Sequence, residues 1–427
     1  MELKTPKGTR DVPPEEKILR DSLISQLKAV FELYGFSPFE TPIFELYDVL
    51  ASKYAGGAEI LKETFKFQDQ GQRDLGLRYD LTVPLARYVA TNPKMKMPFK
   101  RYHVGEVFRD GPVTLARYRQ FTQCDVDTIG ASSLKADAEL LALAQRVFQK
   151  LKLDAIIRIN NRKLLNEMTD SCGIPREKSD DAILTIDKID KVGKEGVKKE
   201  LSEKGIDKDS IEKLSSIIGI NGSNTEKISQ LKKLIPNSNG LKEIEEVLGY
   251  CDALGVEAEF DTSLARGLAY YTGTVMEVVL KDSKVKSSVC GGGRYDNMIG
   301  NFIGKGTVAA VGISFGLDRL FDALSEKEAR KKTVTQVLIV PIAEYEKAAK
   351  MAEELRSEGV SVEIDLMDRG PSKSLAYADS LKIPYVAFIG EEELKEKKMK
   401  LKSMATGKEM LCTVKDAAEE ILKSLNR

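Results

Sequence analysis

The sequence contains a single histidine, no tryptophan and no paired cysteine motif. Because His103 is the only histidine among 427 residues, a Ser-His-Asp or Cys-His mechanism would have to depend on that one side chain, and we expect it to be structural. The five cysteines are scattered without a CxxC pair. This pattern argues against a structural zinc site and a disulfide framework, and it fits a reducing compartment.

Long apolar runs and an excess of either charge are also absent. No segment approaches the roughly 18 consecutive apolar residues of a membrane-spanning helix, and no apolar stretch follows the first charged residues, so we expect a cytoplasmic protein without a membrane partner. Lys plus Arg and Asp plus Glu both total 66, which carries no global signature of a nucleic-acid binder. A positive patch on one face remains compatible with this balance.

The pattern of apolar residues changes three times along the chain and predicts four segments. Residues 1–161 combine an amphipathic helix with several antiparallel strands, whereas residues 162–249 read as short charged helices that form an insertion. Strands return over residues 250–325, including a strand that begins at Tyr270 and a glycine-rich turn at Cys290 to Arg294. Strands and helices alternate over residues 333–427, which predicts a separate α/β domain.

The segment VFRDGPVTLARYRQFTQCDVD, residues 107–127, is the most informative. Two predicted strands flank a polar loop that carries Arg109, Arg117 and Arg119, with Phe121 beside them. Guanidinium groups bind phosphate oxygens in pairs and an aromatic ring can stack on a base, so this hairpin can hold a nucleoside triphosphate. A solvated hairpin with ordinary surface arginines is the alternative.

Four further segments carry polar residues at the ends of predicted elements. In GLRYDLTVPLARY, Asp80 and Thr82 can either receive an ammonium group or simply cap the following helix. In SLARGLAYYTGTVMEV, Arg266 precedes a glycine at the mouth of a strand. CGGGRYDNMIG matches no phosphate-loop pattern, although three adjacent glycines require close backbone approach or a positive φ. GISFGLDRL places Arg319 one turn into a helix.

Taken together and in this order, these segments resemble the histidyl-tRNA synthetases, the class II aminoacyl-tRNA synthetases for histidine. The Pro42 region is similar to the dimer-forming first class motif, the Arg109 hairpin to the second and the Arg319 helix to the third, while RYDLTVPLARY, RGLAYYTG and GGGRYD resemble histidine-specific signatures. The resemblance implies an α+β fold in which a six-stranded antiparallel sheet is flanked by helices. A helical insertion and a C-terminal α/β anticodon-binding domain complete the expected architecture.

The resemblance also implies a role for each matching residue. Arg109 and Arg266 would be the catalytic pair at the α-phosphate and would also contact histidine, and Arg319 would bind the γ-phosphate. Asp80, Thr82 and Gln123 would bind the α-ammonium group of histidine. Asp127 and Tyr271 would bind its imidazole, and Tyr270 and Tyr295 would line the pocket. Arg117 would lie near the triphosphate, and Phe121 would stack on the adenine.

The implied activity is ATP-dependent activation of histidine, helped by Mg²⁺, and its transfer to the 3′ end of tRNA(His) by a homodimer. Two positions depart from the family pattern: Gly111 stands where the second motif commonly has Glu, and Ala269 where the signature usually has Asp. Two alternatives are a histidine-sensing paralogue, similar to the regulatory subunit of ATP phosphoribosyltransferase, and a related enzyme that activates glycine, threonine or proline.

Overall fold

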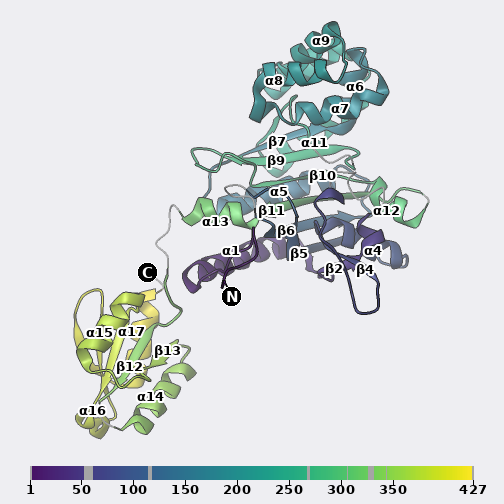
Figure 1. The fold of residues 1–427 in the computed structure, drawn as a ribbon. Coiled ribbons are helices and arrows are strands. Elements are labelled where there is room, and N and C mark those ends of the chain that lie inside the picture. Colours follow the sequence, from purple (N-terminus) through teal and green to yellow (C-terminus); the bar gives the residue numbers. More distant parts are fainter. Residues whose placement is uncertain are drawn as a thin grey trace. The chain divides into compact units, whose positions relative to one another are not determined.

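The computed structural model describes residues 2–51, 61–113, 118–266, 270–304, 306–325, 331–342 and 344–425. The chain divides into two compact units: the first comprises Met1–Asp11 and Ser22–Lys327, and the second Val12–Asp21 and Glu328–Arg427 (Figure 1). Within the described ranges, no helix combines the length and the apolar character that a membrane crossing requires. Each unit has its own sheet.

An eight-stranded sheet forms the centre of the first unit. Its six inner strands pair with one another in antiparallel fashion, as expected, and one short strand that runs parallel to its neighbour extends the sheet at each edge. In spatial order the strands are β1 (Ser37–Pro38), β5 (Phe99–Phe108), β6 (Gln120–Ile129), β11 (Ala310–Gly316), β10 (Cys290–Arg294), β9 (Thr274–Leu280), β7 (Ala155–Asn161) and β8 (Ala258–Phe260).

Helices cover one face of this sheet and leave the other for a cavity. The Phe315 ring of β11 packs on Phe31 of α1 (Pro14–Leu33) and on Phe148 of α5 (Lys135–Lys150), with ring centroids 5.6 and 6.1 Å apart. Successive strand residues face opposite sides, so the neighbouring Ser314 faces away from these helices. The apolar core therefore lies on one side of the sheet and polar chemistry on the other.

Smaller elements surround the sheet. A three-stranded antiparallel sheet, in the order β2-β4-β3, precedes helix α4. The strands and helices are β2 (Phe44–Leu46), α2 (Tyr47–Leu50), β3 (Lys66–Gln68), β4 (Asp74–Leu77), α4 (Thr82–Thr91), α12 (Asn297–Ile303) and α13 (Leu317–Ser325).

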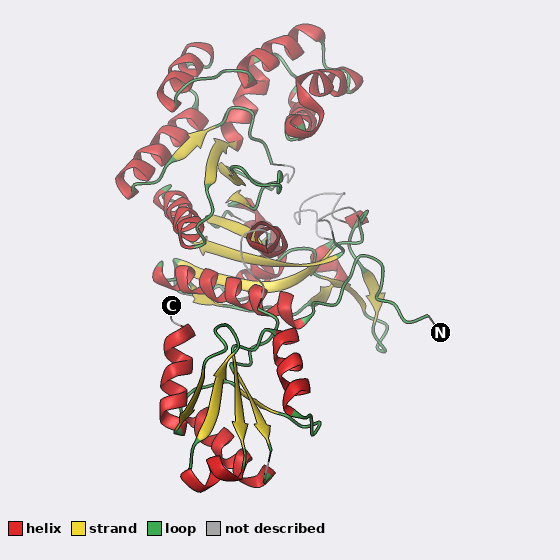
Figure 2. Cartoon of the chain, turned by 90° about the vertical axis from the view of Figure 1, so that its left-hand side faces the viewer, coloured by secondary structure: helices red, strands yellow, loops and turns green. Residues whose placement is uncertain are grey.

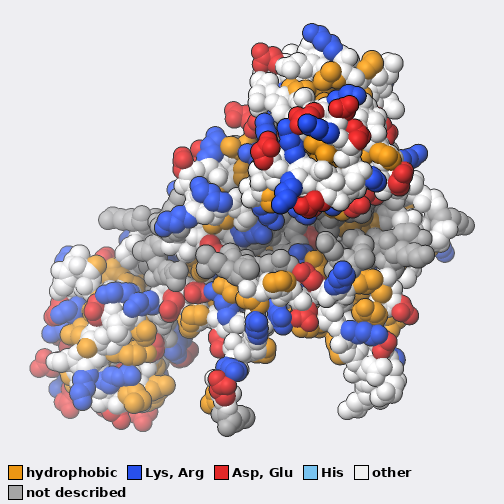
Figure 3. All heavy atoms as spheres, turned by 45° about the horizontal axis from the view of Figure 1, so that its top comes forward, with side chains coloured by type: hydrophobic (Ala, Val, Ile, Leu, Met, Phe, Trp, Pro, Cys, Tyr) orange, Lys and Arg blue, Asp and Glu red, His pale blue; other side chains and the backbone are white. Residues whose placement is uncertain are grey.

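The chain between β7 and β8 forms the expected helical insertion. Its helices are α6 (Arg162–Ser171), α7 (Arg176–Ile186), α8 (Ile189–Glu203), α9 (Lys208–Ile218), α10 (Asn224–Leu234) and α11 (Asn239–Leu254). Acidic and basic side chains are interspersed over the face of this insertion seen in Figure 3. That face therefore has no large patch of a single charge sign.

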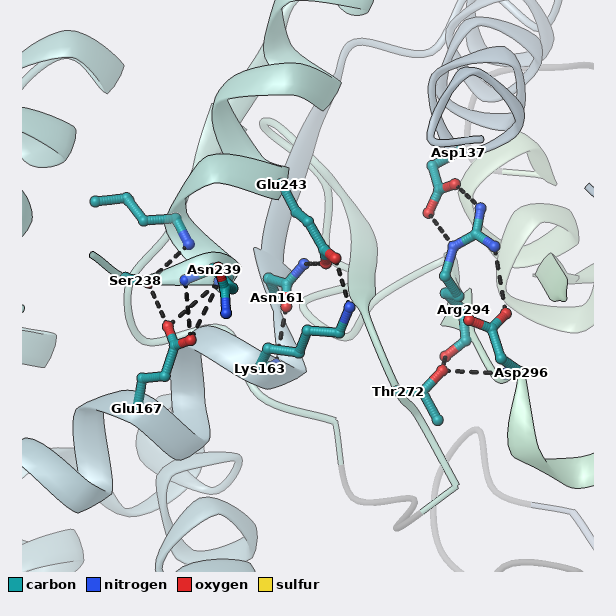
Figure 4. Close-up of polar contacts among 12 residues, drawn as sticks. Asp137, Asn161, Lys163, Glu167, Ser238, Asn239, Glu243, Thr272, Arg294 and Asp296 are labelled. Atoms are coloured by element: carbon teal, nitrogen blue, oxygen red, sulfur yellow. Dashed lines mark hydrogen bonds and ion pairs between the residues drawn. The ribbon is translucent and has the colours of Figure 1, made fainter. Parts of the chain in front are cut away.

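The first and last helices of the insertion are joined at its base. The Glu167 carboxylate of α6 accepts hydrogen bonds from the Ser238 hydroxyl and from the backbone N–H groups of Asn239 and Gly240 (Figure 4). A Cβ on Gly240 would lie 2.2 Å from the backbone nitrogen of Leu164, so only glycine allows the two helices to approach this closely. These contacts fix the insertion where it leaves the sheet.

The second unit confirms the alternation of strands and helices expected near the C-terminus. Its sheet has the order β13-β12-β14-β15-β16, with the first three strands parallel and the last two antiparallel, and helices lie on both of its faces (Figure 2). The elements are β12 (Val337–Pro341), α14 (Tyr345–Ser357), β13 (Val362–Ile364), α15 (Pro371–Leu381), β14 (Tyr385–Ile389), α16 (Glu391–Glu396), β15 (Met399–Ser403), β16 (Glu409–Cys412) and α17 (Val414–Leu425).

Two local expectations were wrong. The predicted glycine-rich turn is strand β10, in the middle of the large sheet, and the strand predicted from Tyr270 begins only at Thr274. The glycines provide close approach rather than a positive φ: a Cβ would lie 2.2 Å from Arg266 Nη1 at Gly291 and 2.0 Å from the Gly312 carbonyl oxygen at Gly292. Glycine's usual weakness in strands is overridden here by packing.

We predict that Gly292→Ala lowers the free energy of unfolding by about 3 kcal/mol or more, because the new methyl group overlaps the backbone of β11. Gly249→Ala is the matched control. Gly249 lies inside α11 with no neighbouring atom within 4 Å of its Cβ position, so this change should stabilise the protein by about 0.5–1 kcal/mol. Denaturant titration of both variants measures the difference, and equal effects would contradict the close packing of β10 on β11.

Candidate active site

Register across the large sheet brings polar side chains and glycines together on the face opposite α1 and α5. Directly paired residues of antiparallel strands point to the same face. One row across β5, β6, β11 and β10 consists of Arg101, Asp127, Gly312 and Gly293. The next row, which continues into β9, consists of His103, Asp125, Ser314, Gly291 and Glu277.

A cavity of about 640 Å³ lies over this polar face. It collects every described residue to which the family resemblance assigned a role, although these residues come from widely separated segments. They are Asp80, Thr82, Arg109, Phe121, Gln123, Asp127, Arg266, Tyr270, Tyr271, Tyr295 and Arg319. Arg119, the other described arginine of the hairpin, does not line the cavity and pairs with Asp110. Arg117 and Ala269 lie outside the described residues.

Asp127 is held in place by two neighbours. The Tyr295 hydroxyl donates to Asp127 Oδ1 over 2.5 Å, and Nη2 of the fully buried Arg101 lies 2.8 Å from Oδ2. The Arg101 contact is an ion pair without hydrogen-bond alignment, so Oδ2 keeps its capacity to accept a hydrogen bond. Burial raises the pKa of Asp127, opposed by Arg101 and by the Tyr295 hydrogen bond.

Glycine makes the position of Asp127 possible. A Cβ on Gly312 would lie 1.9 Å from Asp127 Oδ1, so any other residue there would displace the carboxylate. The neighbouring glycines act in the same way: Gly291 makes room for the Arg266 guanidinium, and a Cβ on Gly293 would lie 2.9 Å from the Tyr271 ring. The glycines of β10 and β11 therefore give the cavity its depth.

Asp80 has the capping role that the sequence offered as an alternative, and it also lines the cavity. Its Oδ1 accepts the backbone N–H groups of Thr82 and Val83 at the start of α4, over 3.0 and 2.9 Å. Burial raises the pKa of Asp80, opposed by the Val83 hydrogen bond and by Arg109. The cap leaves Oδ2 without a role in the helix.

Three guanidinium groups converge at another part of the cavity. Burial lowers the pKa of Arg319, and the like charges of Arg109 and Arg266 lower it further, which requires the three groups to be close. The Arg109 guanidinium lies over the rings of Tyr79 and Phe121, 4.1 and 5.0 Å from their centroids. Such a cluster of fixed cations suits a polyanion such as a triphosphate.

Glu277 partly balances these cations. Its carboxylate lies 3.5 Å from Arg266 Nη1. Burial opposes the charged form of Arg266, but Tyr271 and Glu277 more than compensate and raise its pKa overall. Arg266 therefore stays protonated in its partly enclosed position.

The tyrosines of the cavity form one cluster. The rings of Tyr270 and Tyr271 lie 4.7 Å apart, and those of Tyr270 and Tyr295 lie 6.2 Å apart, because Tyr270 and Tyr271 precede β9. Burial raises the pKa of both Tyr270 and Tyr295 well above the usual value, so their hydroxyl groups remain neutral donors.

A buried network fixes the backbone on both sides of this cluster. Arg294, next to Tyr295, forms an ion pair with the fully buried Asp137 of α5 and another with Asp296 (Figure 4). The Thr272 hydroxyl accepts the Asp296 N–H, and the Thr272 N–H donates to the Arg294 carbonyl. Arg294 thus ties together the two segments that carry the tyrosines.

Several lining residues were not expected from the sequence. Asp125 lies between Gln123 and Asp127 in QCDVD, where strand alternation could have placed it on the same face. Asp187 and Lys191 reach the cavity from the helical insertion, for which no local pattern gave a signal. Gly111 has no side-chain carboxylate to offer where the family pattern has Glu. Its backbone carbonyl accepts a hydrogen bond from Arg119 Nε.

The cavity combines carboxylates with a cation cluster and lacks an activated nucleophile among its described lining residues. Burial raises the pKa of the Cys290 thiol, which keeps it protonated. Burial and the charges of Arg101 and Arg78 lower the pKa of His103 to about 3, and this neutral side chain does not line the cavity. The arrangement suits a reaction in which a substrate supplies the nucleophile and the protein supplies position and charge.

Comparison with known families gives two matches. Residues 8–320 match the family described as histidyl-tRNA synthetase, and residues 336–424 match a family described as anticodon binding domain. The chain is 44% identical to histidine–tRNA ligase 1 of Bacillus cereus over 426 residues, covering 97% of both chains. It is 41% identical to histidine–tRNA ligase 2 of Shouchella clausii over 411 residues, covering 94% of this chain and 96% of the other.

Solved structures give a similar result. The crystal structure of histidyl-tRNA synthetase from a Nostoc species matches with a TM-score of 0.87 and 32% identity, covering 99% of this chain and 100% of that one. A Bacillus halodurans protein described as an ATP phosphoribosyltransferase regulatory subunit/histidyl-tRNA synthetase matches with a TM-score of 0.75 over 89% of this chain and 97% of its own. At 22% identity, the second match shows a shared fold alone.

The buried carboxyl of Asp125 predicts a pH-dependent stability. Burial raises its pKa to about 7, so the folded protein binds this proton more tightly than the unfolded chain, in which the pKa is about 3.9. The resulting stabilisation is complete below about pH 4 and is lost as the pH rises towards 7. Asn has no carboxyl group to titrate, so Asp125→Asn does not lose this stabilisation. Its free energy of unfolding, compared with that of the wild type, should rise between pH 5 and pH 7.5.

Denaturation midpoints at both pH values measure this effect. Asp252→Asn, at an exposed position on α11, is the matched control and should show the same difference from the wild type at each pH. A pH-independent difference for Asp125→Asn would show that the Asp125 carboxyl does not titrate in this range.

Proposed function

The chain belongs to the histidyl-tRNA synthetase family, and we infer that it is a histidine–tRNA ligase. It activates L-histidine with ATP to form histidyl adenylate and pyrophosphate, and then transfers histidine to the 3′ end of tRNA(His). The observation that carries this function is the single cavity in which Asp127 lies together with Arg109 and Arg266.

We propose that the carboxylate-rich part of the cavity binds histidine. Asp80, Thr82 and Gln123 receive the α-ammonium group, and the Asp127 carboxylate accepts a ring N–H of the imidazole. Tyr271 meets the other ring nitrogen, while Tyr270 and Tyr295 line the pocket. The neutral tyrosine hydroxyls and the oriented Asp127 support these roles. A site built to hydrogen-bond its substrate rejects analogues that leave its buried groups unpaired.

The arginine cluster is proposed to bind ATP. Arg109 and Arg266 contact the α-phosphate, Arg319 the γ-phosphate and Arg117 the triphosphate, and Phe121 stacks on adenine. The histidine carboxylate is already a nucleophile, so the protein supplies alignment for in-line attack and neutralises the negative charge that grows at the α-phosphate. A ribose hydroxyl of the terminal adenosine of the tRNA then attacks the activated carbonyl.

Mg²⁺ fits this site as an ion carried by ATP. Among the described residues, no group of three or more His, Cys, Asp or Glu side chains could hold a metal ion alone. Mg²⁺ commonly binds through substrate phosphates and one or two carboxylates. Glu277, beside Arg266, is the carboxylate that we propose for this role, and the ion would neutralise phosphate charge.

We propose that the second unit binds the anticodon of tRNA(His). The loop after β13 exposes Leu366 and Met367, with 76% and 69% of their surface accessible. The buried Asp365 carboxylate accepts the backbone N–H of Arg369 and pairs with its guanidinium, which fixes the loop. Exposed apolar side chains on a loop held in place by an ion pair can pack against the apolar faces of unpaired bases.

A homodimer and a cytoplasmic location complete the proposal. Register in the small sheet places Leu46, Leu75 and Phe67 in one row. Leu46 and Phe67 are 55% and 39% accessible, beside Phe44 at 54%. This apolar face supports a contact with a second copy. Cys124, Cys172, Cys251, Cys290 and Cys412 are all buried and free, which fits a reducing compartment.

The main alternative, a histidine-sensing paralogue, is disfavoured. The curated relatives that match along almost the full length are named histidine–tRNA ligases, and the C-terminal domain, which we expect the sensing paralogue to lack, is present here. Amino-acid-dependent pyrophosphate exchange tests the assignment: histidine should support exchange, whereas glycine, threonine and proline should not.

We predict that Arg266→Ala lowers the rate of histidine-dependent pyrophosphate exchange by at least about 10³-fold, because a fixed cation at the reacting phosphate is lost. Histidine binding, measured calorimetrically without ATP, should change only modestly. Arg146→Ala, at an exposed position on α5, is the matched control and should keep full activity. Near-normal exchange by Arg266→Ala would refute its catalytic role.

We also predict that the double variant Phe44→Glu, Leu46→Glu sediments as a monomer, because charges in the apolar face of the small sheet would be buried without partners. Val192→Glu, at a half-exposed apolar position of α8, is the control and should remain a dimer. A dimeric double variant would place the subunit contact elsewhere.

A further inference from the structure

Three alternate polar side chains of β6 line the cavity and carry buried acceptor atoms without a hydrogen-bond partner. Gln123, Asp125 and Asp127 alternate along the strand, and all three line the cavity. Gln123 Oε1, Asp125 Oδ1 and Asp127 Oδ2 are buried and have no hydrogen-bond partner within the protein. Buried acceptors without partners are rare in folded proteins, so their alignment indicates a ligand rich in N–H donors.

Asp125 is the member of this series without an assigned role. It is 3% accessible and lies directly opposite His103 on one side and Ser314 on the other. His103 is neutral, and Ser314 opposes the rise of the Asp125 pKa as a hydrogen-bond donor. Arg101 also acts on Asp125, but its closest contact is with Asp127. The charge of Asp125 is therefore only partly balanced by the protein.

The spacing along β6 matches the length of the amino acid. Residues two apart in a strand are separated by about 6.6–6.8 Å, comparable to the span from the α-nitrogen of histidine to its ring nitrogens. With Asp127 at the imidazole, the α-ammonium group comes to the level of Asp125. Asp80, whose charge also acts on Asp125, is close to the same place.

We propose that Asp125 is a ligand of the α-ammonium group of histidine and supplies the second carboxylate, beside Asp80, that makes this subsite selective for a cation. The inference rests on the proposed function and deepens it. One oxygen of Asp80 already accepts the two N–H groups at the start of α4. A second carboxylate is therefore needed to surround an ammonium group that carries three donors. Gln123 Oε1 provides the remaining acceptor.

The state of Asp125 before and after binding is consistent with this role. Burial raises its pKa to about 7, so near neutral pH the empty site holds a mixture of neutral and ionised carboxyl groups. An arriving ammonium ion favours the ionised form. In the empty site the neutral fraction of Asp125 avoids the free-energy cost of a buried, unpaired charge. When the ligand binds, Asp125 can ionise and pair with it.

The test compares three ligands on Asp125→Asn, which keeps the shape of the side chain and removes its charge. The KM for histidine in pyrophosphate exchange should rise about 30-fold or more, as expected for loss of one partner of a buried charge pair. The inhibition constant of histamine, which has the ring and the ammonium group, should rise by a similar factor. The inhibition constant of imidazolepropionate, which lacks the ammonium group, should be unchanged.

The other outcomes separate the possible failures. If Asp125 only balances Arg101, all three ligands weaken together, and the inference is wrong. It is also wrong if the KM for histidine stays unchanged. If the wild type shows no histidine-dependent exchange, the proposed function itself fails. Should Asp125→Asn not fold, Asp125→Ser, which is smaller and uncharged, is measured with the same ligands and must give the same pattern.

Discussion

The absence of side chains along the cavity face of β10 and β11 is the constraint on which the rest of the site depends. Gly291, Gly293 and Gly312 lie where a Cβ would overlap Arg266, Tyr271 and Asp127 respectively. The sheet supplies a rigid floor, and its missing side chains provide the depth in which these three groups rest. A cavity made by removing side chains from strands holds its shape more firmly than one made by a loop.

Buried charges then determine what this cavity can accept. Arg101 is fully enclosed beside Asp127, and removal of one partner from such a pair typically costs about 3–5 kcal/mol. The pair is better understood as a means of orienting Asp127 than as a source of stability. Among the described residues, the cluster of Arg109, Arg266 and Arg319 is balanced by the part-exposed Glu277 beside Arg266. The cavity therefore has a carboxylate-lined part and a guanidinium-lined part.

Much of this site was predictable because its motifs are local in sequence. Asp80 and Thr82 of RYDLTVP, Arg109 and Phe121 of the hairpin and Arg319 could be singled out from the sequence because each motif lies at the end of one element, and these residues line one cavity. Their individual roles stay predictions. Arg101 was not identified, because its partner Asp127 is known only once the register of β5 and β6 is fixed. The glycine triplet was misread as a turn because local propensity carries no information about the groups packed above it.

The insertion leaves and rejoins the large sheet through neighbouring strands, since β7 and β8 pair side by side and in parallel. Its first and last helices are also tied to each other by Glu167 at the base. A module whose two ends meet at one edge can gain or lose whole helices over evolutionary time without shifting the register of the strands beneath it. Asp187 and Lys191 are the insertion residues that line the cavity, so changes in the helices farther from it would leave the shape of the cavity intact.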